Sequence, residues 1–344
     1  MELTLRPQNR TVRLEPGRPV LESALAARLN LPHSCKGGSC GSCRARLVAG
    51  SVAYPRGRPL GLSDAEAAAG YVLLCQAVPA SDLVVEAREV RAVTDVEIKT
   101  LPCRVERLER LAPDVMALYL RLPAVEDFRF RAGQYLDVML PGGRRRSFSI
   151  ASPPHDAGLL ELHVRRVEGG EFTARVFAPL AAGTLLRIEG PLGQFVYREP
   201  ADAASLDPLV LVAGGTGFAP VKAILRHLLE TGIRRPVHLY WGARHAVDLY
   251  QDAWVRERVA RFPELRYVPV LSMAAGAEAA HHRTGLVHAA VLADFAGLAT
   301  AEVYAAGPPA LIAALRATLP ARGLAPERLY FDSFDYAPDA REHR

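Results

Sequence analysis

The 344-residue chain lacks long hydrophobic runs, and its mean hydropathy is only +0.06. A membrane-spanning helix needs about 18 or more consecutive apolar residues, so the sequence predicts no membrane span. The first residues, MELTLRPQNR, have no apolar segment of the kind that secretory signals carry, which favours a cytoplasmic protein. Lysine is also scarce, and it occurs only at positions 36, 99 and 222. The net charge of +5 is too small to predict binding to nucleic acid.

The remaining composition is that of a folded protein, with 50% hydrophobic and 23% charged residues. Because domains usually span about 100–200 residues, we expect two or three of them. Charge is unevenly distributed, since residues 23–63 contain no acidic side chain. This stretch predicts a positive surface, although a general preference for arginine would explain it equally well. Its basic residues are Arg28, Lys36, Arg44, Arg46, Arg56 and Arg58.

The cysteines form a specific pattern near the N-terminus. Cys35, Cys40 and Cys43 are spaced C-x4-C-x2-C, and Cys75 follows in YVLLCQA, which is the plant-type [2Fe-2S] arrangement. Structural zinc is the alternative, but zinc sites usually take two C-x2-4-C pairs. Cys103 lies outside the pattern, and we expect it to be a half-buried strand residue without chemistry. Glycine permits the backbone dihedrals that a tight cluster loop requires, here at Gly37, Gly38 and Gly41.

Elements of a small mixed domain surround these cysteines. Two strands are expected within Glu2–Leu14, a helix over Val20–Leu29 and a closing strand over Leu83–Glu89. The segment SDAEAAAG predicts a short helix that Ser63 caps. Residues 1–93 therefore resemble the ferredoxin-type β-grasp domain.

A second domain is expected over residues 101–203, after a linker at 94–100. Short alternating runs such as MALYLRLP and LELHVRRV, separated by turn residues, predict an antiparallel β-barrel. Within it, Arg146-Ser147-Phe148-Ser149 resembles the R-x-[YF]-S motif of the ferredoxin-NADP reductase superfamily. The resemblance implies that Arg146 pairs with an FAD phosphate, that Phe148 packs on the flavin ring and that Ser149 is a catalytic group near its N5 atom.

A second stretch of this barrel also carries the resemblance. A strand ends near Arg165, a glycine pair follows, and Phe-Thr opens a helix whose amides suit phosphate. In the resembling family this segment cradles the flavin pyrophosphate. The cofactor-binding candidates are Val164, Arg165, Gly169, Gly170, Phe172 and Thr173.

Residues 204–344 alternate between apolar runs and amphipathic helices, which predicts a parallel sheet and makes the whole chain a combination of α+β and α/β domains. A glycine-rich turn follows the first apolar run and precedes a helix, as a pyrophosphate site requires. With Phe218-Ala219-Pro220 behind it, the turn resembles the GGTGxAP motif of the same superfamily. The cofactor-binding candidates are Gly214, Gly215, Thr216, Gly217 and Pro220.

The C-terminal part holds further candidates. Gly307 and Pro308 stand where the family has a C-G-x-P turn beside the nicotinamide, but Ala306 replaces the usual cysteine. The resemblance makes Asp332 and Phe334 catalytic candidates, although Phe334 would also suit an ordinary core.

The choice of nicotinamide is open to two interpretations. Arg244, after the second expected strand, would accept the 2′-phosphate of NADPH. The resembling family members with a WGAR…DLY stretch mostly prefer NADH, and we favour NADH on that ground.

The resemblance extends over nearly the full length and implies a monomeric NADH-dependent reductase that uses FAD and a [2Fe-2S] cluster. Flavin would convert the two electrons of a hydride into the single electrons that a cluster accepts. The chain resembles the CDP-6-deoxy-glucoseen reductase group, which supplies a dehydrase, and the reductases of aromatic-ring oxygenases such as naphthalene dioxygenase. The basic stretch predicts an acidic docking face on that acceptor protein. The same motifs would also suit a redox sensor without turnover or a free-standing flavin reductase, although the attached ferredoxin-type domain argues against the latter.

Overall fold

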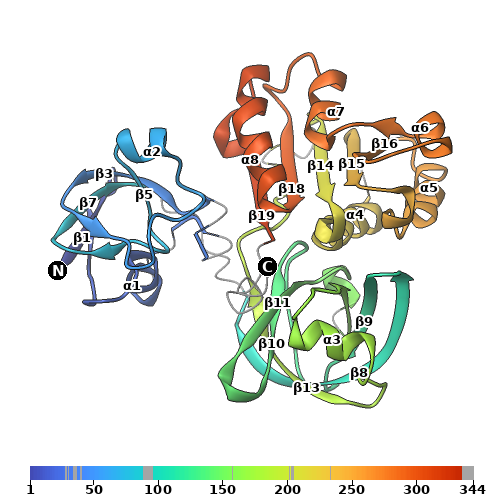
Figure 1. Ribbon diagram of the computed structural model, residues 1–344, viewed down its shortest axis with the longest axis horizontal. Helices are drawn as coiled ribbons and strands as arrows, with labels where there is room; N and C mark the ends of the chain where they lie inside the picture. Colours follow the sequence, from blue (N-terminus) through green and yellow to red (C-terminus); the bar gives the residue numbers. More distant parts are fainter. Residues whose placement is uncertain are drawn as a thin grey trace. The chain divides into compact units, whose positions relative to one another are not determined.

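The computed structural model describes residues 1–27, 29, 31–33, 37–38, 41–87, 96–156, 158–200, 202, 205–232 and 234–334. The chain divides into two compact units, Met1–Asp95 and Val96–Arg344 (Figure 1). Among the described residues, no helix combines the length and the apolar character that crossing a membrane requires.

The first unit is built on a mixed five-stranded sheet with the strand order β2-β1-β7-β3-β5. Helix α1 packs on one face, because its apolar residues Val20, Leu21 and Ala24 join the core of the sheet. Helix α2 begins with the expected capping box, in which Ser63 and Glu66 bond to each other's backbone amides. The elements are β1 (Glu2–Arg6), β2 (Arg10–Arg13), α1 (Val20–Ala26), β3 (Arg44–Ala49), β4 (Val52–Ala53), α2 (Asp64–Ala68), β5 (Tyr71–Leu73), β6 (Val78–Pro79) and β7 (Leu83–Glu86).

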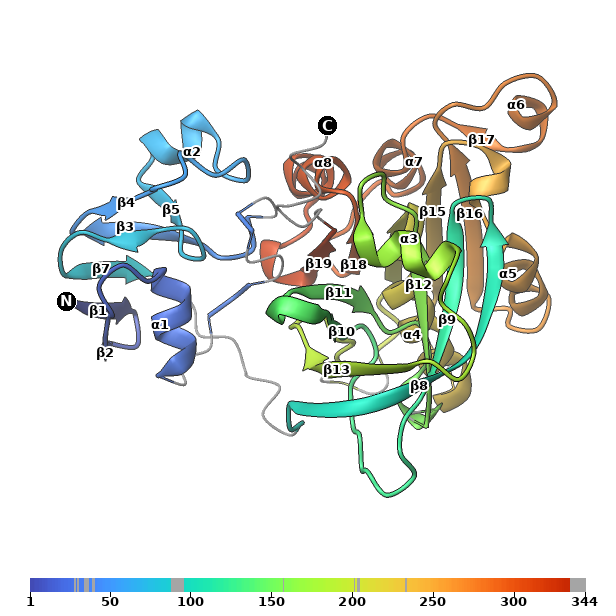
Figure 2. The ribbon, with the colours of Figure 1, turned by 60° about the horizontal axis from the view of Figure 1, so that its bottom comes forward.

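The second unit starts with the expected antiparallel barrel, whose strand order is β11-β10-β13-β8-β9-β12 (Figure 2). A bridge between Ile150 and Leu162 joins the two ends of this sheet. The first strand begins at Lys99, inside the expected linker. The elements are β8 (Lys99–Ala112), β9 (Val115–Arg121), β10 (Tyr135–Met139), η1 (Pro141–Gly143), β11 (Arg145–Ser149), η2 (Pro154–Asp156), β12 (Leu159–Arg165), α3 (Glu171–Phe177) and β13 (Leu185–Leu192).

The rest of the second unit is a parallel sheet with the order β17-β16-β15-β14-β18-β19. Its first elements are β14 (Leu209–Gly214), η3 (Gly215–Gly217), α4 (Phe218–Thr231), β15 (Val237–Ala243), η4 (Ala246–Asp248), α5 (Asp252–Val259) and β16 (Leu265–Leu271). The remaining ones are α6 (Ala277–His281), β17 (Arg283–Thr284), α7 (Val287–Asp294), β18 (Glu302–Gly307), α8 (Pro309–Thr318), η5 (Leu319–Arg322), η6 (Pro326–Arg328) and β19 (Leu329–Ser333).

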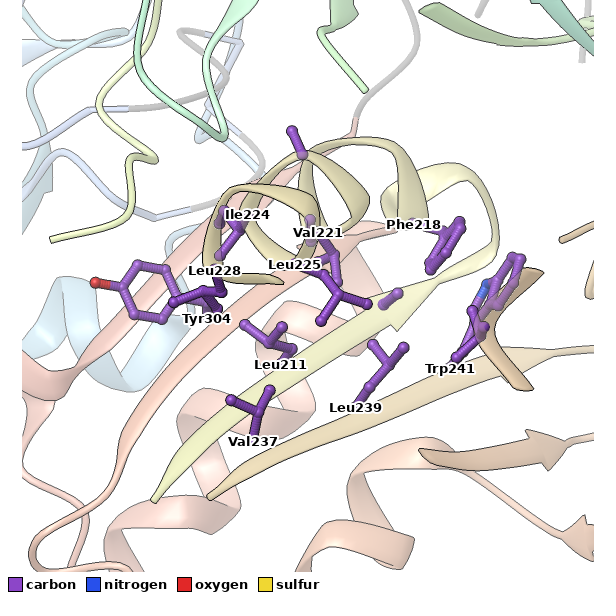
Figure 3. Close-up of a cluster of buried hydrophobic side chains, with 14 of the residues drawn as sticks. Leu211, Phe218, Val221, Ile224, Leu225, Leu228, Val237, Leu239, Trp241 and Tyr304 are labelled. Carbon is purple, nitrogen blue, oxygen red and sulfur yellow. The ribbon is translucent and has the colours of Figure 1, made fainter. Parts of the chain in front are cut away.

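Successive residues of the central strand β14 enter different cores, because side chains alternate between the two faces of a sheet. Leu209 and Leu211 pack under α4 and α5, whereas Val210 and Val212 pack under α7 and α8. Figure 3 shows the first of these cores, in which Trp241 stacks on Phe218 with ring centroids 3.8 Å apart. Helices thus cover both faces of the sheet. A ligand would bind at the edge formed by the carboxyl ends of the strands.

Candidate functional site

The first candidate centre lies in the N-terminal unit, where β3 and β5 run side by side. Cys43 immediately precedes β3 and Cys75 closely follows β5, so the antiparallel pairing of these strands brings the two thiols together. The backbone N–H of Cys75 donates to Cys43 Sγ at 3.4 Å, and both residues are buried. Cys35 and Cys40 lie outside the described residues. The two described thiols fit the donor set of an iron–sulfur cluster, which is held by cysteine thiolates.

The cluster loop is held by close contacts at a glycine. Gly38 has a φ of +82°, and a Cβ added there would lie 2.7 Å from both Gln76 Cγ and Pro59 Cβ. The backbone N–H of Gly61 donates to the Gly38 carbonyl at 2.8 Å. The expectation that glycine provides an unusual backbone conformation in this loop is therefore confirmed at Gly38, and Gly41 has a φ of +73°.

Tyr54 is a neighbour of this centre that sequence reasoning missed. Its hydroxyl accepts a hydrogen bond from the Leu73 N–H at 2.9 Å. Burial raises the pKa of Tyr54, and negative charge on the nearby Cys43 and Cys75 sulfurs adds to the effect. The phenol therefore stays protonated beside the cysteines. No sequence signal distinguishes it from other tyrosines.

The candidate flavin residues of the first motif lie on β11. Register with β10 places Phe148 opposite Leu136 and Ser149 opposite Tyr135. Phe148 is half-buried and packs against Phe172, with ring centroids 5.4 Å apart, and Ser149 is buried. Arg146 is partly exposed on the same strand and donates to the Arg145 carbonyl at 2.8 Å. One strand thus carries all three predicted side chains, in the sequence order that the motif requires.

Arg165 ends the neighbouring strand β12, and its guanidinium is only partly satisfied. Its Nε atom lies 3.2 Å from Asp114 Oδ2, while Nη2 is buried without a hydrogen-bond partner among the described residues. Its Nη1 atom would lie 3.2 Å from a Cβ at Gly215, so the side chain also lies beside the glycine turn of the parallel-sheet domain. A guanidinium with a buried, unused donor fits a phosphate group.

The other residues of the second flavin motif have structural contacts of their own, in the turn before α3 or in the barrel core. The Thr173 hydroxyl accepts from the Val167 N–H at 3.2 Å and lies 3.0 Å from the Gly170 carbonyl, so it closes the turn before α3. Gly169 has a φ of +71°. Val164 and Phe172 belong to the barrel core, being 0% and 1% exposed. Their side chains pack inside the barrel, and any contact with a flavin would come from their backbone.

The nicotinamide candidates meet where β14 and β18 end next to each other. Helix α4 leaves β14 on one face and α8 leaves β18 on the other, which makes this the switch point at which open α/β sheets bind ligands. The two turns approach so closely that a Cβ at Gly217 would lie 2.0 Å from the Ala306 carbonyl oxygen. A Cβ at Gly214 would lie 2.8 Å from Pro308 Cδ. Both glycines allow the two turns to pack this closely. We call the paired turns the nicotinamide cradle, because a glycine turn that opens a helix presents backbone amides to a pyrophosphate.

The remaining candidates are placed around this cradle. Gly307 lies with a φ of +153° close to Gly214, and its carbonyl accepts from the Phe334 N–H at 2.8 Å. Phe334 packs partly against the main core, and Asp332 lies opposite Ala306 in the pairing of β19 with β18. Thr216 is half-buried within the turn. Residues 335–344 lie outside the described chain.

Pro220 and Arg244 are the two cofactor-binding candidates that lie apart from the glycine turns in role or position. Pro220 is buried in the first turn of α4, where a missing N–H does no harm, so its side chain serves the helix. Arg244 is exposed at the end of β15, with its Nε atom 4.0 Å from Asp248 Oδ2. Asp248 also accepts from the His245 N–H at 3.1 Å.

Comparison with known proteins agrees with this arrangement. Three family models match: a 2Fe-2S iron-sulfur cluster binding domain over residues 3–80, an oxidoreductase FAD-binding domain over 102–197 and an oxidoreductase NAD-binding domain over 211–317. The CDP-6-deoxy-L-threo-D-glycero-4-hexulose-3-dehydrase reductase of Yersinia pestis is 38% identical over 92% of each chain. Reductase component 2 of the terephthalate 1,2-dioxygenase of Comamonas sp is 36% identical over 94% of each.

A solved structure covers the same length. The crystal structure of the Amycolatopsis reductase GcoB has a TM-score of 0.72, with 35% sequence identity, over 97% of this chain and 98% of that one. The chain therefore belongs to the family of [2Fe-2S] ferredoxin-type flavoprotein reductases. It is an NAD(P)H-dependent oxidoreductase that binds FAD and a [2Fe-2S] cluster and passes electrons to an acceptor.

Proposed function

We propose that the protein takes electrons from NADH and delivers them, through FAD and the cluster, to a dehydrase that acts on a nucleotide-linked deoxysugar. The observation that carries the proposal is the 38% identity to the Yersinia pestis dehydrase reductase over 92% of both chains. The second candidate acceptor is an aromatic-ring oxygenase, which the 36% identity to the Comamonas reductase component supports.

The residues present fit the roles that this function requires. Bound flavin supplies the conversion of a two-electron donor into a one-electron donor. Arg165, with its unused buried donor, and Arg146 would hold the flavin phosphates. Phe148 would pack on the ring, and the Ser149 hydroxyl would bond to its edge. The cluster would be held by Cys43 and Cys75 together with Cys35 and Cys40.

The nicotinamide would bind in the cradle between the β14 and β18 turns, along Gly214, Gly215 and Gly307. Asp332 and Phe334, at the end of β19, would then line the place where the nicotinamide ring meets the flavin ring. Ala306 leaves no thiol beside the nicotinamide. Because hydride transfer depends on orientation, the alanine would change the rate without abolishing the reaction.

Our choice of NADH over NADPH rests on the end of β15. Arg244 would attract a 2′-phosphate, but Asp248 lies 4.0 Å from its Nε atom and would repel one. The WGAR…DLY stretch of the NADH-preferring family members contains both residues.

The experiment that tests this function is an anaerobic titration of the purified protein with NADH and, separately, with NADPH. We expect the flavin and iron–sulfur absorbance bands to bleach together, at a lower concentration of NADH than of NADPH. Bleaching of the flavin alone would remove the cluster from the pathway. Very slow bleaching of both would favour a redox sensor without turnover.

The identity of the acceptor is tested by supplying candidate proteins to the reduced enzyme. A purified hexulose-3-dehydrase and a terephthalate dioxygenase component would each be mixed with NADH and the reductase. We expect faster electron delivery to the dehydrase. Faster delivery to the dioxygenase would replace the first proposal with the second.

An acidic docking face on the acceptor is supported less by the structure than the sequence alone implied. Arg44 pairs with Glu66, Arg58 pairs with Asp64, and Arg46 lies 3.9 Å from Glu86, so acids from outside the basic stretch balance several of its cations. Arg28 and Lys36 lie outside the described residues.

We expect added salt to slow reduction of the acceptor protein while leaving reduction of ferricyanide unchanged, because salt screens the attraction between protein surfaces. The measurement compares both rates at low ionic strength and about 0.5 M salt, where the Debye length is only a few ångströms. Equal effects on the two acceptors would contradict electrostatic docking.

A further inference from the structure

Four polar side chains meet in a buried site where the barrel contacts the parallel-sheet domain. Glu161 and His163 come from β12, Lys222 comes from α4, and Tyr250 lies between η4 and α5. Lys222 Nζ donates to both carboxylate oxygens of Glu161, at 2.7 and 2.9 Å. Glu161, His163 and Lys222 are each no more than 5% exposed. The ion pair is thus largely shielded from water.

His163 extends the pair into a chain of hydrogen bonds. Its Nε2 atom lies 3.0 Å from Glu161 Oε1, and its Nδ1 atom lies 3.0 Å from the Tyr250 hydroxyl. Burial lowers the pKa of His163, so the ring is neutral. A carboxylate only accepts, so Nε2 carries the proton and Nδ1 accepts from Tyr250.

The charge of Glu161 is retained despite its burial. Burial alone would raise the pKa of this carboxyl, but the hydrogen bond from His163, together with the hydrogen bonds and positive charge of Lys222, holds it below its usual value. Tyr119 also donates to Glu161 Oε1, at 3.4 Å. The carboxylate is therefore surrounded by donors, and its position is determined from several directions.

The network joins the elements that carry the two nucleotide sites. On β12, His163 is two residues before Arg165, the candidate phosphate ligand of the flavin. On α4, Lys222 follows the Gly215–Gly217 turn, which belongs to the nicotinamide cradle. A second contact supports the same alignment, since Arg165 Nη1 would lie 3.2 Å from a Cβ at Gly215.

Stability alone does not account for such a network. A buried ion pair is often no more stabilising than apolar side chains of similar volume, whereas removal of one partner is strongly destabilising. Lysine is also exceptional in this chain, which has only three of them among its 42 basic residues. One of the three lies at this interface, where its ammonium group contacts both oxygens of Glu161.

We propose that Lys222, Glu161, His163 and Tyr250 are positioning residues that set the distance and angle between the nicotinamide and flavin rings for hydride transfer. They act through β12 and α4 and touch neither ring. The inference rests on the reduction of FAD by NAD(P)H, which family membership establishes, and is independent of the acceptor protein. A loss of alignment would lower the rate of hydride transfer more than it would lower affinity.

The test uses the full-length holoenzyme, stopped-flow mixing with NADH and three variants, Lys222→Met, Glu161→Gln and Lys222→Arg. We expect the first two to lower the limiting rate of flavin bleaching by about 10- to 100-fold, with the dissociation constant for NADH changed less than about threefold. The long-wavelength charge-transfer band that forms between the nicotinamide and flavin rings after mixing should weaken in parallel. Lys222→Arg should restore part of the rate, since a guanidinium keeps the positive charge and can donate to both oxygens of the Glu161 carboxylate.

A double variant, Lys222→Met with Glu161→Leu, keeps the test valid should a single change prevent folding, because it leaves no unpaired charge. The matched control is Lys99→Met, which removes a partly exposed lysine that lies 3.4 Å from Glu126. A double variant that retains FAD and bleaches at the wild-type rate would overturn the proposal. An unchanged limiting rate with weaker NADH binding would overturn it as well, since it would indicate a role in binding only.

Discussion

Replacing Cys43 with alanine is expected to abolish electron delivery to a protein acceptor, while NADH continues to reduce the flavin. The cluster needs four thiolates, and Cys43 is one of the two described candidates, which β3 and β5 bring together. The FAD-binding and NAD-binding domains match residues 102–197 and 211–317, which belong to the second compact unit. Loss of the cluster should therefore leave the reduction of the flavin by NADH intact. Cytochrome c reduction and the visible iron–sulfur absorbance measure one effect, and anaerobic flavin bleaching measures the other.

The fifth cysteine of the chain, Cys103, serves as the control for the Cys43→Ala variant. Cys103 lies on β8 and is 2% exposed rather than half-buried, and burial raises the pKa of its thiol to about 12. Cys103→Ala should therefore retain the cluster absorbance and the rate of cytochrome c reduction. If Cys43→Ala keeps both as well, Cys43 is not a ligand and the cysteine assignment fails.

The second large effect is expected for Gly217→Ala. The added Cβ would lie 2.0 Å from the Ala306 carbonyl oxygen, a separation that forces the β14 and β18 turns apart. A misplacement of about 1 Å in such a site lowers the rate by about 100-fold, and we expect at least that loss in NADH-driven flavin bleaching. Dithionite, which needs no nicotinamide site, should still reduce the bound flavin at the normal rate.

Gly297→Ala is the matched control for this change. A Cβ at Gly297 meets no atom within 4 Å, and this glycine is in the same domain. The control should bleach at the wild-type rate. A Gly217→Ala enzyme that also bleaches normally would show that the two turns tolerate separation, and the cradle would lose its assigned role.

Local patterns in the sequence were sufficient for much of the fold. The alternation in LELHVRRV predicted a barrel strand, and β12 covers Leu159–Arg165. The Ser63 cap was readable because a capping box depends only on residues a few positions apart. Helix α1 was expected to reach Leu29 but ends at Ala26. Leu29 packs into the core from the segment that follows the helix.

The buried network could not be predicted in the same way. Alternation places Leu160 and Leu162 inside the barrel and turns Glu161 and His163 outwards, which normally means towards water. Here helix α4 covers that outer face and supplies Lys222. Only the packing of two domains against each other, which no local pattern encodes, makes these residues buried.

The sequence also left open how some candidate site residues would contact a cofactor. A family motif marks positions without telling whether the side chain or the backbone is used. Val164 and Phe172 belong to the barrel core, and the Thr173 hydroxyl holds its own turn. The alternation of β12 would have revealed Val164, since it shares a face with Leu160 and Leu162.

The placement of the tryptophans gives the molecule a built-in optical reporter. The chain has two, Trp241 and Trp254, and both belong to the parallel-sheet domain. Trp241 is fully buried against Phe218, and its indole N–H donates to the Gly215 carbonyl at 3.0 Å, within the glycine turn. Intrinsic indole emission therefore follows the melting of this domain and the state of that turn. The N-terminal unit has no indole, so this emission reports the stability of the parallel-sheet domain without a tryptophan signal from the N-terminal unit.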